Sequence, residues 1–213
     1  MSESKEKSRI IEFHDIIVWI LAICLLYVIS LENYLLFHTV TELFSIFVAF
    51  VIFLIVWKSR TRLENRSLIF IGIAYFFVAS LDLLHTFTYK GMEIFPQYGT
   101  NVPTQLWIAA RYMESISLLV APLFLIDVHA ANAVKNKDPG EKKRFFLWVF
   151  LTYAGVTAAC VLSILVFSNF PDSYIEDSGL TSFKITSEYI ISFILLFSLI
   201  NLYIRKDRFE EHI

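Results

Sequence analysis

Six apolar stretches of roughly 20 residues each constrain the fold of this chain more than any other feature of its sequence. A helix of about 20 apolar residues crosses the roughly 30 Å hydrocarbon core of a bilayer. The stretches are continuously apolar rather than alternating, which favours helices over a β-barrel. The sequence therefore predicts an all-α, polytopic membrane protein, a six-transmembrane-helix bundle with spans at 16–30, 35–57, 67–86, 104–129, 145–167 and 187–204.

Composition excludes several other classes. The chain of 213 residues is 57% apolar and 18% charged, against about 45–50% and about 25% in ordinary globular domains. The spans leave only short tails and connections, so a separate soluble enzyme domain has no room, and no nucleic-acid partner is indicated. Cys24 and Cys160 fall inside apolar stretches, where no disulfide framework is expected. The sequence contains no phosphate-binding loop, nucleophile elbow or cysteine-based zinc motif, so we expect no enzyme activity in this module.

Lysine and arginine predict the orientation. Fifteen of the 18 basic side chains lie in the two tails and in the second-to-third and fourth-to-fifth connections. Only Lys90 and Lys184 fall on the opposite side, and Arg111 lies within a span. Positive charge gathers on the cytoplasmic side, so both termini are predicted to be cytoplasmic, in an inner (plasma) membrane. We expect a cytoplasmic tail at 1–15, the membrane domain at 16–204 and a linker beginning at 205–213.

Ionisable side chains cluster inside three consecutive spans. A charged group at the bilayer centre costs roughly 2.5–3.5 kcal/mol on insertion scales, so such groups are candidates for function. Here they come in pairs three or four residues apart, a spacing that places both members on one helix face. The candidate ligand-binding residues are these three pairs and the Trp107 ring beside them: His38, Glu42, Asp82, His85, Trp107, Arg111 and Glu114.

The three pairs are expected at a similar depth. The second and fourth spans enter from the outer side near Leu35 and Thr104, and the third leaves near Thr86. At 1.5 Å per residue, the fourth-span pair would lie roughly 10–15 Å in. Antiparallel helices with short connections pack side by side. The sequence thus predicts one polar chamber in the outer half of the bilayer, in which Arg111 contacts at least one carboxylate.

The chemistry of that chamber admits three interpretations. The carboxylates outnumber the guanidinium, so a buried charge of about −2 must be neutralised by protons or by a cation. A purely structural network would fix helix register. A haem, a quinone or another organic ligand is the second alternative. A divalent metal ion is the third, because imidazole and carboxylate ligands suit such ions, with ligands from His38, His85, Glu42, Asp82 and Glu114.

Three segments between residues 37 and 125 resemble a known family. They read FHTVTELFSI, IGIAYFFVASLDLLHTFTYKGM and TQLWIAARYMESISLLVAPLFL. They are similar to the membrane-associated sensor family, third type (the MASE group), which forms the N-terminal membrane module of bacterial and archaeal histidine kinases and diguanylate cyclases. The family pattern that this chain matches runs through His38, Glu42, Asp82, His85, Tyr89, Gly91, Met92, Gln105, Trp107, Arg111 and Glu114.

The resemblance implies a sensory role. We expect a histidine-kinase or two-component input module that detects a cue in the chamber and signals through the sixth span to a cytoplasmic output domain, working as a homodimer. A transporter or channel is one alternative, although transport sites usually lie at the interface of internal repeats and no repeat is visible here. An intramembrane metal-dependent hydrolase is another. It needs three ligands and an open position, but no nucleophile is apparent.

Overall fold

A computed structural model describes residues 2–60, 62, 63, 65–124 and 139–204, with side chains from residue 15 onward. It divides into two compact units, Met1–Glu42 and Leu43–Ile213, and each is described by itself. The first unit contains α1 (Ser2–Glu32) and the beginning of α2 (Tyr34–Ser59). Between these helices, the Asn33 side chain accepts a hydrogen bond from the Leu36 backbone N–H at 3.0 Å, a typical cap for a helix start.

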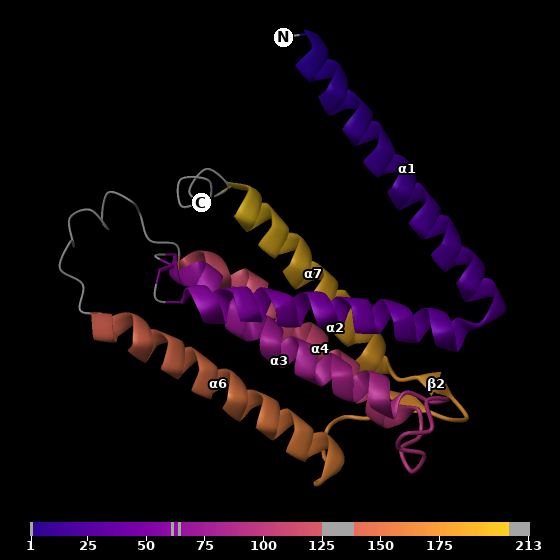
Figure 1. Ribbon diagram of the computed structural model, residues 1–213. Coiled ribbons are helices and arrows are strands. Elements are labelled where there is room, and N and C mark those ends of the chain that lie inside the picture. Colours follow the sequence, from indigo (N-terminus) through magenta and orange to yellow (C-terminus); the bar gives the residue numbers. More distant parts are fainter. Residues whose placement is uncertain (1, 61, 64, 125–138, 205–213) are drawn as a thin grey trace. The chain divides into compact units, whose positions relative to one another are not determined.

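The second unit is built around two antiparallel helices (Figure 1). These are α3 (Arg66–Thr88) and α4 (Asn101–Val120), and one 3-10 turn, η1 (Ala121–Phe124), follows α4. The second part of α2 and α6 (Pro139–Leu165) pack against α3, while α7 (Ser182–Ile204) packs against α4. A short hairpin, β1 (Tyr174–Ile175) paired with β2 (Gly179–Leu180), precedes α7.

Small and branched side chains hold α3 at the centre. Ile73, Leu81 and Leu106 are fully buried in the α3–α4 interface. At the α2–α3 crossing, a Cβ atom on Gly72 would lie 2.5 Å from a methyl carbon of Val56, which is closer than real Cβ contacts allow. The absence of a side chain at Gly72 therefore sets the distance between these two helices.

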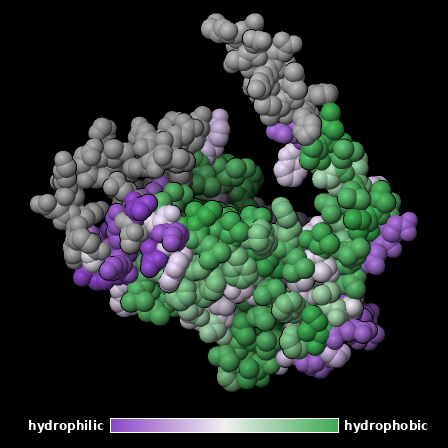
Figure 2. All heavy atoms as spheres, in the orientation of Figure 1, coloured by the Kyte–Doolittle hydropathy of each residue, from purple (hydrophilic) through white to green (hydrophobic). Residues whose placement is uncertain are grey.

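Aromatic rings join α6 to α3. The ring centroids of Phe77 and Phe150 are 5.1 Å apart, and those of Phe77 and Tyr153 are 6.0 Å apart. Outside this seam the long sides of the helices present apolar residues, and Figure 2 shows the visible face of the second unit as largely hydrophobic. Such a surface suits contact with lipid rather than with water.

The structure confirms the predicted all-α membrane fold. Six of its described helices are long and apolar enough to cross a membrane, at Asp15–Glu32, Tyr34–Ser59, Arg66–Thr88, Asn101–Phe124, Gly140–Leu165 and Ser182–Ile204. The predicted end of the fourth span, 125–129, and the predicted linker, 205–213, lie outside the described residues. The last helix starts at Ser182, five residues before the predicted span, so Lys184 belongs to its first turn rather than to a connection.

Candidate functional site

Arg111 links two helices through two carboxylates. Its Nη1 donates to Glu114 Oε2 at 2.5 Å, one turn along α4, and its Nη2 donates to Asp82 Oδ2 on α3. The Arg111 and Asp82 side chains are 23% and 6% exposed, so this pair is largely removed from solvent. Charge-assisted hydrogen bonds from a planar guanidinium fix the orientation of its partners. The structure thus confirms the predicted contact of Arg111 with a carboxylate, in which both Asp82 and Glu114 take part.

The two oxygens of the Asp82 carboxylate differ in their hydrogen bonding. Oδ2 accepts from Arg111, whereas Oδ1 is buried and has no hydrogen-bond partner within the described part of the chain. On the other side of the network, the Tyr75 hydroxyl donates to Glu114 Oε1 at 3.5 Å. A buried acceptor without a partner costs about 1–3 kcal/mol. Asp82 Oδ1 is therefore suited to receive a hydrogen-bond donor or a cation.

His85 is held in one orientation by α4. Its Nδ1 lies 2.8 Å from the backbone carbonyl oxygen of Pro103. Because a carbonyl oxygen only accepts, Nδ1 carries the proton, and in the neutral ring the lone pair lies on Nε2. In metal-binding histidines, one ring nitrogen usually donates to a carbonyl or carboxylate in this way while the other ring nitrogen is the ligand. His85 thus has the tautomer and the rigidity that a ligand would need.

His38 and Glu42 belong to the first unit, on α2. They are four residues apart in one continuous helix, so they share a face. Since the two units are described separately, the prediction that these residues share a chamber with Asp82, His85 and Arg111 stays a prediction. Metal binding by His38, His85, Glu42, Asp82 and Glu114 also stays a prediction.

Two residues near Arg111, Lys184 and Tyr75, were missed from the sequence. Lys184 Nζ lies 3.5 Å from the centroid of the Trp107 ring and 2.8 Å from Glu188 Oε1. The Arg111 guanidinium carbon lies 5.9 Å from the same ring centroid. The signal that would have revealed Lys184 is its i,i+4 spacing from Glu188, an ion-pair spacing on a helix. Tyr75 was missed as well, although it lies seven residues, two helical turns, before Asp82.

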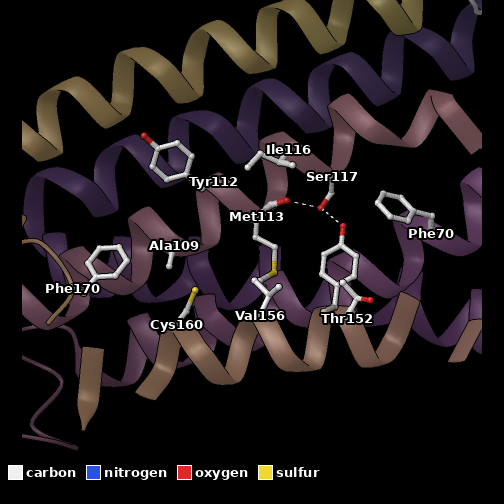
Figure 3. A pocket seen from close by; sticks show the side chains of 11 residues that line it. Phe70, Ala109, Tyr112, Met113, Ile116, Ser117, Thr152, Val156, Cys160 and Phe170 are labelled. Atoms are coloured by element: carbon white, nitrogen blue, oxygen red, sulfur yellow. Dashed lines mark hydrogen bonds between the residues drawn. The ribbon is translucent and has the colours of Figure 1, made fainter. Parts of the chain in front are cut away.

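A separate apolar cavity of about 470 Å³ lies between α4 and α6 (Figure 3). Three hydroxyls along it are used within the protein: Ser117 donates to the Met113 carbonyl at 2.5 Å and pairs with Tyr153, and Thr152 donates to the Trp148 carbonyl. The cavity contains none of the predicted site residues. Its lining is Phe70, Ala109, Tyr112, Met113, Ile116, Ser117, Thr152, Tyr153, Val156, Cys160 and Phe170.

Six helices that are long and apolar enough to cross a membrane, with acidic and basic side chains paired between two of them, define a polytopic membrane domain. The chain belongs to the membrane-associated sensor domain family MASE3, which matches residues 29–213. No curated protein and no solved structure matches the chain significantly. It is therefore a multi-pass membrane sensor domain, as the resemblance of its middle segments implied.

Proposed function

We propose that this sensor domain detects a cue at Arg111, Asp82 and Glu114, which together form the Arg111 network. The signal then passes through α7 to a cytoplasmic output domain, a kinase or cyclase. The domain itself acts as an input module rather than as an enzyme. One observation carries the proposal: a guanidinium bridges two acids inside membrane-crossing helices while Asp82 Oδ1 remains without a partner among the described residues. A ligand that binds Asp82 Oδ1 would compete with Arg111 for the same carboxylate and so change the contact between α3 and α4.

Helical spacing supports adding the α2 pair to this site. Ile46 and Ala49 of α2 pack against Ala79 of α3. Glu42 lies four residues before Ile46, and His38 four before Glu42, so both continue the stripe of α2 that carries Ile46. We therefore propose that His38 and Glu42 complete the chamber that Asp82, His85, Arg111 and Glu114 begin.

A divalent metal ion is the cue or cofactor that this set of groups favours. Asp82 and Glu114 carry one more negative charge than Arg111 neutralises, and Glu42 would add another. A cation offsets that charge, and imidazole with carboxylate suits Zn²⁺, Mn²⁺ or Ni²⁺. The His85 tautomer supports the same conclusion. The apolar cavity, by contrast, has Ser117, Thr152 and Tyr153 engaged within the protein, which makes it a poorer site for the polar ring of a quinone.

Metal analysis of the purified domain tests this choice. We expect about one divalent ion per chain after exposure to Zn²⁺, and no haem Soret band in the absorption spectrum. The double substitution of His38 and His85 by alanine should remove that ion, whereas His14→Ala, in the N-terminal tail, should retain it. A double variant that keeps its bound zinc would contradict the metal assignment.

The orientation and the partners complete the proposal. The basic residues favour both termini in the cytoplasm, with a tail at 1–15 and a linker starting at 205–213, and we propose a homodimer in the inner membrane. A phosphatase or fluorescent-protein fusion after Ile213 tests the orientation. Fluorescence with no periplasmic phosphatase activity is expected, and the opposite pattern would reverse the topology.

A further inference from the structure

Lys184 is a buried cation in the first turn of α7. Its side chain is only 8% exposed. A lysine near a helix end usually extends its stem so that the ammonium reaches water. Here the ammonium lies instead against the Trp107 ring of α4 and beside Glu188, one turn further along α7. Lys184 therefore connects α7 to the helix that carries Arg111.

Two cations lie close to the same indole ring. Lys184 Nζ is 3.5 Å, and the guanidinium carbon of Arg111 5.9 Å, from the Trp107 centroid. An aromatic face attracts a cation, but like charges repel one another, most strongly where water is excluded. At rest each cation has an acid beside it: Arg111 contacts Asp82 and Glu114, and Lys184 contacts Glu188. The contact between α4 and α7 thus depends on both ion pairs.

We propose that Lys184 is the positioning residue through which α7 responds to the charge balance around Arg111. This rests on the proposed function of the Arg111 network as the cue site. A cue that occupies Asp82 or Glu114 leaves the guanidinium less compensated, because arginine does not release its proton. The less compensated guanidinium then repels Lys184 more strongly near the Trp107 ring. The outer end of α7 then moves away from α4.

The packing of α7 suits it to carry such a movement. Lys184, Ser187, Ile191 and Ser198 are its buried residues, and most of its other large side chains are exposed. It therefore touches its neighbours along one narrow stripe. A helix of 23 residues is about 35 Å long. A displacement at Lys184 is thus conveyed along the whole helix toward Ile204.

A substitution matrix in the full chain tests the proposal. The 213-residue chain is fused to a reporter histidine kinase, and Asp82→Asn or Glu114→Gln removes one compensating charge. Each change is made with Lys184 retained, with Lys184→Arg and with Lys184→Met. Kinase autophosphorylation reports the output. Fluorescence of Trp107 reports the local contact in protein whose other tryptophans, Trp19, Trp57 and Trp148, are replaced by phenylalanine.

Removal of one carboxylate should change the kinase output by about fivefold or more when residue 184 is lysine or arginine, and should change Trp107 emission in the same proteins. Both effects should be lost with Lys184→Met. Equal changes in all three backgrounds would overturn the role of Lys184 while leaving the cue site intact. If Asp82→Asn and Glu114→Gln both leave the output unchanged, the proposed function fails instead, and the emission of Trp107 alone decides the role of Lys184.

Lys90→Met is the matched control. Lys90 is the other basic residue predicted on the outer side, and it is exposed. The same loss of one positive charge there should leave the response to Asp82→Asn as it is in the parent chain. If Lys90→Met abolished the response as Lys184→Met does, the effect would reflect net charge at the outer surface, and the specific contact with Trp107 would be disproved.

Discussion

Arg111 is the residue whose surroundings are most strongly prescribed by physical chemistry. A guanidinium inside a membrane span cannot neutralise itself, so the surrounding helices must supply acids. The sequence indicated this need and offered Glu42, Asp82 and Glu114. The contact with Glu114 follows from its i,i+3 spacing on α4, whereas the contact with Asp82 depends on helix packing, which places α3 and α4 side by side. The contact of Lys184 was not predicted, because the local sequence around a lysine near a polar connection does not show whether its ammonium lies in water or against an aromatic ring.

Replacement of Arg111 by alanine should leave the Asp82 and Glu114 carboxylates without their guanidinium partner. Because Asp82 is 6% exposed, loss of its partner should lower the free energy of unfolding by about 3–5 kcal/mol. Thermal denaturation in detergent measures this change. Adding Asp82→Asn to Arg111→Ala should restore part of the loss, since the stranded charge is then removed. An Arg111→Ala protein as stable as the parent would show that the pair contributes nothing to the fold.

Binding of zinc should weaken in acid. Only the neutral imidazole is a ligand, and ordinary imidazoles become protonated below about pH 6.5. Affinity for Zn²⁺ is therefore expected to be full above neutral pH and to decline steeply below about pH 6. Titration calorimetry over this range provides the measurement. An affinity that stays constant down to pH 5 would exclude His38 and His85 as ligands.

At the scale of elements, the apolar stretches were sufficient to locate all six helices, because span length and continuous hydrophobicity leave few alternatives. The start of α7 was misplaced because its first two turns contain the polar residues Ser182, Lys184 and Ser187. Two of these, Lys184 and Ser187, are nevertheless buried. The β1–β2 hairpin was also missed, since two-residue strands carry no alternating pattern to detect.

The crossing of α2 and α3 depends on Gly72. An alanine there would place a methyl group against Val56, and overpacking of this kind costs about 1–3 kcal/mol. Gly155 on α6 is the matched control, because nothing lies within 4 Å of its added Cβ. Gly155→Ala should be neutral or stabilising by up to about 1 kcal/mol. Equal melting temperatures for the two variants would contradict the close approach of α2 and α3.

Insertions that change the helical phase between α7 and the output domain test whether α7 is a rigid transmitter. Insertion of one to four residues after Ile204, in a fusion to a reporter kinase, rotates the output domain by about 100° per residue. Output should rise and fall with that rotation and return toward its starting level after four residues. Output that ignores every insertion would mean that the signal does not travel through α7.

At the scale of the whole molecule, the family and the membrane architecture define a sensor domain, and we propose the Arg111 network as its point of contact with a cue. The fold class followed from hydropathy alone, and the spacing of Arg111 and Glu114 followed from the sequence, while the approach of Asp82 to Arg111 required the packing of α3 against α4. For the cue we propose a divalent cation, on the grounds of the charge of the site and the His85 tautomer.

The most direct test measures reporter-kinase output in proteoliposomes as Zn²⁺, Mn²⁺ or Ni²⁺ is added on the side opposite the termini. At least one of these ions should change the output of the parent fusion by about fivefold or more. The same ion should leave the fusion with His38→Ala and His85→Ala unaffected. An identical response in the two fusions, or no response of the parent to any of the three ions, would contradict a metal-sensing chamber.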